Sequence, residues 1–268
     1  PRAQREAIFA VYAFCRIVDD AVDQGDDRDG QRRELARWRE EIERVWSGGA
    51  PGHPAGERLQ AVVRRFPIPR EALLEIIAGV EMDLDHATYE TFDALYPYCY
   101  RVASAVGLCC IEIFGYRDPR AREYAIALGI ALQLTNIMRD VQVDARMGRV
   151  YLPQDELRRH GVTGRDLAEG HYTPAFVGLM RAQGARAREY YTRAWRSLPP
   201  GDRGRLFAAE IMGRTYWALL QTMEARGYRV FGERVTVPAR RRVAIALREW
   251  LGAWRGAPVR LPGPGRFG

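Results

Sequence analysis

Apolar and polar positions recur along the chain with the spacing of helices. Ala, Leu, Arg and Glu dominate the sequence, and runs of alternating β-branched residues are hard to find. The longest apolar runs, residues 102–111 and 125–132, are shorter than the roughly 18 residues that a membrane span needs. The pattern therefore predicts an all-α fold without a membrane span.

Prolines and glycines separate the helical stretches. Six prolines stand where a first helical turn would begin: Pro69, Pro119, Pro153, Pro174, Pro200 and Pro238. We predict loops at residues 24–30, 48–56, 144–153 and 160–173, and a Pro/Gly-rich tail from residue 256. No loop is long enough to link two domains, so residues 1–268 are predicted to form one domain. Because Pro1 already lies in a predicted helix, an N-terminal segment is expected to be missing.

Charge and cysteine content narrow the possible functions. The net charge of +7 comes entirely from arginine, since the chain contains no lysine. Guanidinium pairs with phosphate through two hydrogen bonds, so these residues suit phosphorylated ligands at least as well as nucleic acid. The cysteines fall in apolar helices without Cys-x-x-Cys spacing, which indicates buried thiols in a reducing compartment, the cytoplasm: Cys15, Cys99, Cys109 and Cys110.

Two helices carry the candidate chemistry. One contains Asp19 and Asp23, four residues apart on one helical face, with Arg16 beside them. The other contains Asp140 and Asp144 at the same spacing, preceded by an asparagine one turn earlier. A single pair of this kind is usually a solvated helix face, but here the arrangement occurs twice in otherwise apolar helices.

The two pairs predict a metal site. Buried carboxylates without a cation are costly, so facing pairs indicate that cations lie between them. Asn136 adds an amide oxygen, and no histidine or cysteine supports the set. Oxygen ligands alone favour Mg²⁺, which usually also binds oxygens of a substrate phosphate.

Polar side chains around the pairs suit a diphosphate: Arg16, Arg139, Arg149, Tyr151, Tyr216 and Arg234. Metal and arginines would stabilise the negative charge that develops on a departing diphosphate. If the carbon left behind is allylic, it becomes a carbocation. The Tyr, Phe, Val and Leu side chains of these helices supply the water-free cavity that such a cation needs.

Four ordered stretches resemble the squalene and phytoene synthase family over almost the whole chain. They are residues 10–23 (AVYAFCRIVDDAVD), 98–107 (YCYRVASAVG), 133–140 (QLTNIMRD) and 148–153 (GRVYLP). The chain looks most like the bacterial presqualene diphosphate and squalene synthases of the hopanoid pathway, and less like phytoene synthases. The resemblance implies a Mg²⁺-dependent prenyltransferase with an isoprenoid-synthase helical bundle around a central cavity.

The resemblance also implies roles for individual residues. Two or three Mg²⁺ ions would be bound by Asp19, Asp23, Asn136, Asp140 and Asp144, supported by Gln133. Phosphate oxygens would be held by Arg16, Arg139, Arg149 and Arg234. The reacting centre would be lined by Tyr12, Tyr98, Tyr151 and Tyr216. The wall along the prenyl tail would be shaped by Val102, Val106 and Gly107, although Gly107 fits a helix–helix contact equally well.

Two positions depart from the family pattern. Relatives often carry an acidic residue just before the last aspartate of the second motif, where this chain has Val143. Metal binding is expected to survive on Asp140 and Asp144. The N-terminal stretch in which relatives place a serine and an aromatic residue near the substrate is absent from this sequence.

By analogy, one prenyl diphosphate ionises, the alkene of a second molecule attacks the cation, and proton loss closes a cyclopropane. Two farnesyl diphosphates would give presqualene diphosphate, with squalene as a further product, whereas two geranylgeranyl diphosphates would give phytoene. The base would be a tyrosine hydroxyl or the released diphosphate, because no histidine except His86, three residues after Asp83, is placed to serve. NADPH is not favoured, because no Gly-x-Gly-x-x-Gly follows a strand.

Other classes fit less well. A basic helical protein that binds membrane or nucleic acid is the non-enzymatic alternative, but an acidic inner face suits a polyanion poorly, so no nucleic-acid partner is expected. The basic C-terminal helix after Pro238 could still lie on the inner face of a membrane. Di-iron carboxylate proteins would need two Glu-x-x-His pairs, which are absent. Class I terpene cyclases share the metal and diphosphate chemistry, and the segment from Arg149 to Tyr151 argues against them.

Overall fold

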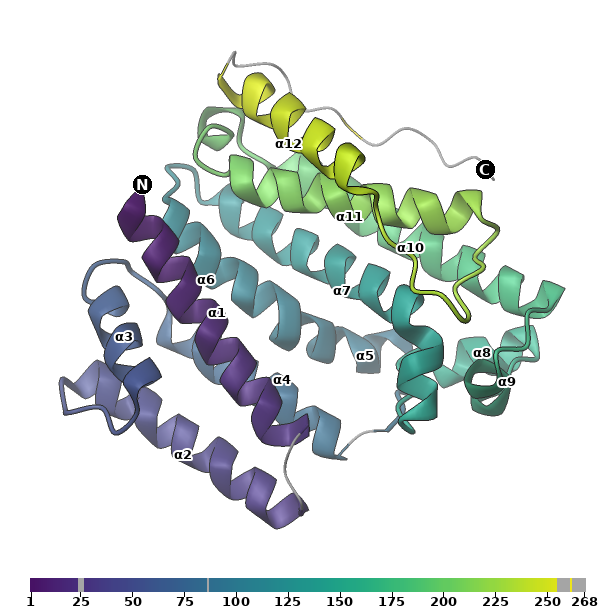
Figure 1. Ribbon diagram of the computed structural model, residues 1–268, viewed down its shortest axis with the longest axis horizontal. Coiled ribbons are helices and arrows are strands. Elements are labelled where there is room, and N and C mark those ends of the chain that lie inside the picture. Colours follow the sequence, from purple (N-terminus) through teal and green to yellow (C-terminus); the bar gives the residue numbers. More distant parts are fainter. Residues whose placement is uncertain (24–26, 86, 255–260, 262–268) are drawn as a thin grey trace.

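Helices form almost all of the regular structure. The computed structural model describes residues 1–23, 27–85, 87–254 and 261, apart from the side chains of residues 23, 253 and 254. Its α-helices are α1 (Arg2–Asp23), α2 (Arg28–Ser47), α3 (Pro54–Val63), α4 (Arg70–Asp85), α5 (Phe92–Cys99), α6 (Ala105–Phe114), α7 (Arg120–Arg146), α8 (Gln154–His160), α9 (Gly164–Glu169), α10 (Pro174–Ser197), α11 (Phe207–Ala225) and α12 (Ala239–Trp254). A π-helical turn, η1 (Tyr100–Ser104), joins α5 to α6, and a 3₁₀ turn, η2 (Pro200–Asp202), follows α10. The predicted all-α class is confirmed (Figure 1).

The prolines stand at the starts of helices, as predicted. Pro174 is the first residue of α10, and Thr173 before it accepts a hydrogen bond from the backbone of Phe176. Pro119 and Pro153 directly precede α7 and α8. Proline is favoured there because the first backbone N–H groups of a helix have no partner within the helix.

All four internal loop predictions are wrong in part. Helix α2 already begins at Arg28, α3 begins at Pro54, and α7 continues beyond Asp144. In the predicted loop 160–173, residues 164–169 form α9. A capping box between Thr163 and Asp166 starts this short helix, and Gly170 ends it in the left-handed conformation at φ 77°. These local hydrogen bonds stabilise a helix that has few apolar residues of its own.

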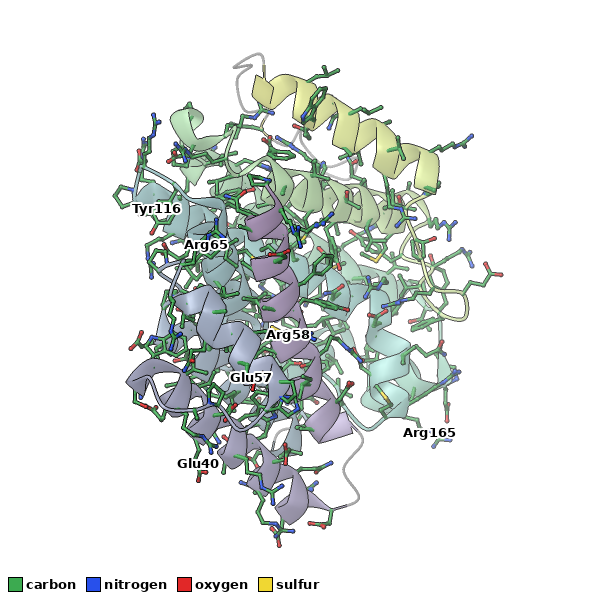
Figure 2. The ribbon with its side chains drawn as sticks, turned by 60° about the vertical axis from the view of Figure 1, so that its left-hand side comes forward. Glu40, Glu57, Arg58, Arg65, Tyr116 and Arg165 are labelled. Carbon is green, nitrogen blue, oxygen red and sulfur yellow. The ribbon has the colours of Figure 1, made fainter. Side chains whose placement is uncertain are left out.

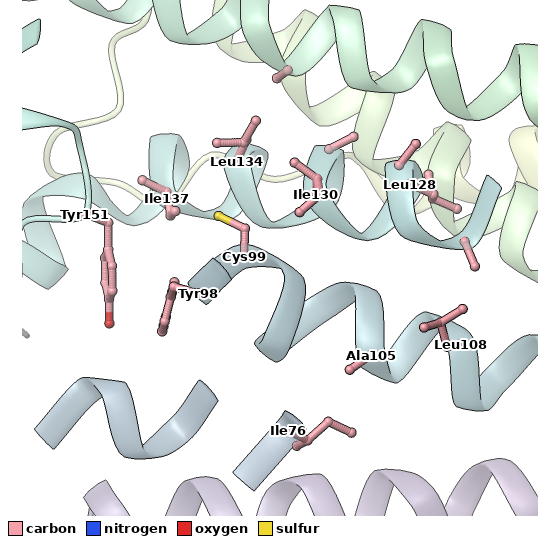
Figure 3. Close-up of a cluster of buried hydrophobic side chains, with 14 of the residues drawn as sticks. Ile76, Tyr98, Cys99, Ala105, Leu108, Leu128, Ile130, Leu134, Ile137 and Tyr151 are labelled. Carbon is pink, nitrogen blue, oxygen red and sulfur yellow. The ribbon is translucent and has the colours of Figure 1, made fainter. Parts of the chain in front are cut away.

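Helix α7 lies at the centre of the bundle. It packs against α10 on one side and against α6 and η1 on another. Figure 3 shows Ile130, Leu134 and Ile137 of α7 in one buried cluster with Cys99 of α5 and Ala105 of α6. A row of buried apolar residues thus fixes the rotation of α7, and this rotation decides where its polar residues point.

A close backbone approach sets the distance between α7 and η1. A Cβ atom added at Gly129 would lie 2.5 Å from the Cα of Ser104, so only glycine fits. The Ser104 hydroxyl also donates to the carbonyl oxygen of Ile126 at 2.8 Å. On the other side of η1, Gly79 of α4 allows the same close approach to Arg101. The π-helical turn is therefore held tightly between α4 and α7.

The continuous helical stretch Phe92–Phe114 includes this turn. By length and composition it is the one stretch among the described residues that could cross a membrane, although core helices of soluble proteins pass the same test. Its residues Leu95, Cys99 and Ile111 are fully buried against other helices. The apolar character of the stretch thus reflects in part its place in the core.

A short backbone pairing joins the end of α4 to the segment that follows α7. The Val150 amide donates to the Ala87 carbonyl at 2.7 Å, and the Gln154 amide donates to the Tyr89 carbonyl at 2.9 Å. A bridge between Thr88 and Val150 is the only β pairing in the described part of the chain. Residues far apart in the sequence are thereby brought next to each other.

Charged side chains cover the outside of the bundle. Figure 2 shows Glu40, Arg58 and Arg165 standing out from their helices. The four cysteines are free, as expected, but only Cys99 and Cys109 are buried, while Cys15 and Cys110 are half-buried. Burial still raises the pKa of the Cys110 thiol to about 11, so it stays protonated at neutral pH.

The Gly129 contact generates a prediction about stability. Alanine normally stabilises a helix relative to glycine, but here the added methyl group meets the backbone of Ser104, which cannot move without shifting η1. We expect Gly129→Ala to lower the free energy of unfolding by about 1–3 kcal/mol in urea denaturation. Gly204→Ala is the control, because nothing lies within 4 Å of its added Cβ, and it should stay within about 0.5 kcal/mol. An equal effect of both substitutions would contradict the contact.

Candidate active site

One face of α7 carries a row of polar residues toward its C-terminal end. Gln133, Asn136, Asp140 and Asp144 are spaced by three or four residues, so they line up on the helix. All four side chains are half-buried. The Oδ1 atom of Asn136 is buried and has no hydrogen-bond partner among the described residues. An unpartnered buried oxygen of this kind suits a bound cation or donor.

Two arginines hold the carboxylate of Asp140. Arg139 Nε donates to Asp140 Oδ1 at 2.8 Å, and Arg234, from the segment before α12, donates to both oxygens at 3.2 and 3.1 Å. Burial opposes the charge of Asp140, but the arginines outweigh it, so its pKa lies below the usual range. The sequence-predicted phosphate-binding arginines Arg139 and Arg234 thus meet at one carboxylate.

Asp144 lies in the opposite electrostatic situation. Burial and the negative charges of Asp140 and Asp83 raise its pKa to about 7, against the pull of Arg149 and Arg139. The amide of Arg149 donates to the Asp144 carbonyl at 2.9 Å, which fixes the turn after α7. The arginines near the polar face of α7 therefore do not fully offset the negative charge of its carboxylates.

A third carboxylate, Asp83 of α4, belongs to the same region. Tyr151 donates its hydroxyl proton to Asp83 Oδ1 at 2.7 Å, and Tyr98 donates to Oδ2 at 3.2 Å. The two tyrosine rings stack (Figure 3). Their centroids are 4.9 Å apart, and the centroid of the buried Tyr89 ring lies 5.7 Å from that of Tyr98. Burial and the charge of Asp83 raise the pKa of both hydroxyls, so they remain protonated donors.

Sequence reasoning missed Asp83 as a site residue. The backbone pairing between residues 87–90 and 150–155 brings Tyr151 to the end of α4, and no sequence pattern marks this pairing. One signal was available: Asp83 follows the apolar residues Ile76, Ile77 and Val80 in a buried helix, much as Asp140 does in α7. His86, the histidine that we considered as a base, lies outside the described residues.

A groove of about 370 Å³ lies beside Asp140. Its wall includes Arg139, Thr215 and Tyr216 together with Arg234 and Arg242. Tyr216 and two of the four predicted phosphate-binding arginines therefore line the same groove. Three guanidinium groups in one groove favour an anion with several oxygens.

The first aspartate motif is placed less completely. Asp19 is half-buried on α1, and Arg16 pairs with Asp20 at 2.7 Å. Tyr12 is 62% exposed, and the side chain of Asp23 lies outside the described residues. Within the described part of the chain, no three acidic, histidine or cysteine side chains stand close enough to hold a metal ion by themselves. The predicted facing of the two motifs remains a prediction.

The residues predicted to form the tail wall lie in tight helix contacts. Val102 and Val106 are partly buried against the core. A Cβ at Gly107 would lie 3.2 Å from the Ala125 carbonyl of α7, which supports the helix–helix alternative for this glycine. Val143, which stands where relatives often carry an acidic residue, is 57% exposed, because it lies on the side of α7 away from the core.

The oxygen donors suit a magnesium-bound diphosphate. Carboxylate and amide oxygens with excess negative charge lie along α7, and arginines that can bind phosphate lie beside them. The protonated Tyr98 and Tyr151, hydrogen-bonded to Asp83, lie next to this charged region. The arginines beside α7 can bind an anionic leaving group, and the cluster of Tyr98, Tyr151 and Asp83 can accept or donate a proton.

Comparison with known sequences identifies the family. The sequence model of the family described as squalene/phytoene synthase matches residues 1–241. A phytoene synthase of Arthrospira platensis is 39% identical over 254 residues, which cover 89% of this chain and 81% of that protein. The presqualene diphosphate synthase of Rhodopseudomonas palustris is 37% identical over 249 residues, which cover 92% of this chain and 88% of the relative.

Solved structures agree with the sequence comparison. A dehydrosqualene synthase crystallised with a ligand superimposes with a TM-score of 0.82 at 28% identity, covering 93% of this chain and 87% of that one. The squalene synthase of Alicyclobacillus acidocaldarius gives a TM-score of 0.76 at 31% identity, covering 85% and 86%. The chain belongs to the squalene/phytoene synthase family of head-to-head prenyltransferases.

Proposed function

We propose that this chain joins two farnesyl diphosphates head to head, forming presqualene diphosphate and releasing one diphosphate. The observation that carries the proposal is the polar face of α7, where an unpartnered Asn136 oxygen and the undercompensated Asp144 lie beside arginines that converge on Asp140. Similarity to the presqualene diphosphate, dehydrosqualene and squalene synthases supports the farnesyl substrate.

Phytoene synthesis from two geranylgeranyl diphosphates is the second candidate. The phytoene synthase of Arthrospira platensis is as similar to this chain as the presqualene diphosphate synthase, at 39% against 37% identity. The two activities differ in tail length alone at the condensation step, so the depth of the prenyl cavity decides between them.

Magnesium is part of the proposal. Asn136, Asp140 and Asp144 would hold it, together with Asp19 and Asp23 of α1, and it would supply the positive charge that stabilises a departing diphosphate. Arg139, Arg149 and Arg234 would bind phosphate oxygens. Arg139 and Arg234 now pair with Asp140, and each guanidinium can turn to a phosphate when a cation takes its place. The magnesium ion would then balance the charge of the carboxylates, and the arginines would balance the charge of the phosphate oxygens.

The Asp83 cluster would accept the proton that the reaction releases. The C–O bond of one substrate breaks and diphosphate leaves with the electron pair; the alkene of the second substrate then attacks the allylic cation. Closing the cyclopropane breaks a C–H bond. A tyrosine hydroxyl oxygen would take this proton while its own proton moves to Asp83, along the hydrogen bonds from Tyr98 or Tyr151.

Product analysis tests the substrate and the reaction. We expect incubation with farnesyl diphosphate and Mg²⁺ to give presqualene diphosphate by mass spectrometry, with and without NADPH, and Asp140→Ala to lower the rate about 100-fold or more. Squalene formed only with NADPH would show that the enzyme also converts presqualene diphosphate to squalene in a second step. Phytoene from geranylgeranyl diphosphate, without product from farnesyl diphosphate, would contradict the farnesyl assignment.

Metal binding has a readout that does not need turnover. We expect MgCl₂ with inorganic diphosphate to stabilise the protein, by about 2.7 kcal/mol at a hundredfold excess over Kd, in chemical denaturation. Asn136→Ala and Asp140→Ala should each reduce this shift, because they remove oxygen ligands. Asp118→Asn, before the opposite end of α7, is the control and should keep it. An unchanged shift in Asp140→Ala would place the metal elsewhere.

Asp83→Asn tests the proton acceptor. The amide keeps the shape of the carboxylate but cannot take up a proton, so we expect kcat to fall roughly 10²–10⁴-fold with little change in KM. Diphosphate release should fall less than cyclopropane formation, with farnesol accumulating as water captures the cation. Asp85→Asn is the matched control, since Asp85 is exposed and pairs with Arg32. If both products fall equally in Asp83→Asn, the residue acts on ionisation and the acceptor role is wrong.

A further inference from the structure

The described side chains that fix helix α12 to the bundle lie along one side of it. Its residues Ile245 and Glu249 are buried, at 7% and 4% exposure. Glu249 accepts a hydrogen bond at 2.9 Å from Arg203, which also binds Glu210 of α11 at 2.7 Å. Figure 1 shows α12 lying along α11 at the edge of the molecule. These contacts fix which face of α12 turns outward.

The outer face of α12 is apolar. Val243, Leu247, Trp250 and Leu251 are 58%, 56%, 51% and 39% exposed. They follow one another at intervals of four, three and one residues, so they form a single stripe opposite the buried Ile245 and Glu249. Isolated exposed apolar residues are common, but a continuous stripe on one helix indicates an interaction surface.

Positive charge borders this stripe. Arg240, Arg241, Arg242 and Arg248 are exposed, and the only acidic residue of α12 is the buried Glu249. Arg241 and Arg248 flank the stripe on one side, and Arg242 flanks it on the other. Arg241 also donates to Gln221 of α11 at 3.1 Å, and Arg248 pairs with Glu249 at 2.7 Å. Every exposed charge on α12 is therefore positive.

We propose that the outer face of α12 (Val243, Leu247, Trp250 and Leu251) binds the surface of an anionic lipid bilayer. An apolar stripe with an arginine border fits a helix that lies in the headgroup region, with the stripe in the acyl boundary and the arginines on the phosphates. In a symmetric dimer through this face, the arginine borders would meet each other and repel. Nucleic acid would bind the arginines but leave the apolar stripe in water.

The position of α12 would bring a bound bilayer close to the active site, an argument that rests on the proposed function. Arg242 and Ala239 at the start of α12 line the same groove as Arg139, Tyr216 and Arg234. A bilayer bound to α12 would therefore lie close to the candidate diphosphate site. Prenyl diphosphates and their condensed products carry long apolar chains, so they partition into membranes and would enter and leave the site at the lipid surface.

Vesicle co-sedimentation tests the surface without substrate. We expect the full chain to bind vesicles of phosphatidylglycerol and phosphatidylcholine at least about tenfold more strongly than pure phosphatidylcholine vesicles, and less strongly in high salt. The double variant Leu247→Glu/Trp250→Glu should lose at least about tenfold of this binding. Phe9→Glu is the matched control, because Phe9 is 62% exposed on α1, and it should bind like the wild type. Arg240→Gln/Arg248→Gln should weaken only the binding to anionic vesicles.

Several outcomes would overturn the proposal. They are equal binding to both kinds of vesicle, wild-type binding by the folded double variant, and a dimer in sedimentation equilibrium that this variant dissociates. Activity in detergent separates this proposal from the proposed function. Vesicle binding without turnover of farnesyl or geranylgeranyl diphosphate would refute the function and leave the surface standing, whereas normal turnover in detergent without vesicle binding would refute the surface alone.

Discussion

The charge on the polar face of α7 is the constraint on which the rest of the site depends. A buried carboxylate is stable only when cations or hydrogen-bond donors offset its charge. Asp140 meets this condition through Arg139 and Arg234, but Asp144 does not, since burial and its acidic neighbours raise its pKa to about 7. A protein that keeps such a face in its interior gains from a ligand that brings positive charge.

The packing of α7 determines how this face is presented. Gly129 brings α7 against the backbone of Ser104, and Gly79 brings α4 against the same π-helical turn. Tyr98, two residues before that turn, thereby lies between Asp83 of α4 and the Tyr151 ring that follows α7. Close helix packing and site geometry are thus two consequences of the same small residues, and a shift of η1 would alter both.

Much of the fold could be predicted from local sequence, because helix signals act within a few residues. The six prolines predicted helix starts correctly, whereas α9 escaped prediction because its capping box lies in a stretch with few apolar residues. The polar row of α7 follows from spacing alone.

Contacts between distant segments could not be derived in this way. Asp83 meets Tyr151 through a pairing of two irregular segments, and Arg234 reaches Asp140 from a loop 94 residues away. No periodicity encodes these contacts, since they depend on the tertiary arrangement of α4, α7 and α11. The family resemblance supplied Arg234 as a phosphate-binding candidate but gave no reason to consider Asp83.

The central claim is that the polar face of α7 binds magnesium together with a diphosphate. A crystal structure with Mn²⁺ in place of Mg²⁺ and a non-reactive thio analogue of farnesyl diphosphate tests it most directly, because Mn²⁺ is located by its anomalous scattering. The account predicts a metal ion at the Asn136 amide oxygen and the Asp140 carboxylate, with Arg234 turned from Asp140 to a phosphate oxygen. A complex in which Arg139 and Arg234 still hold Asp140, with no metal at Asn136, would contradict it.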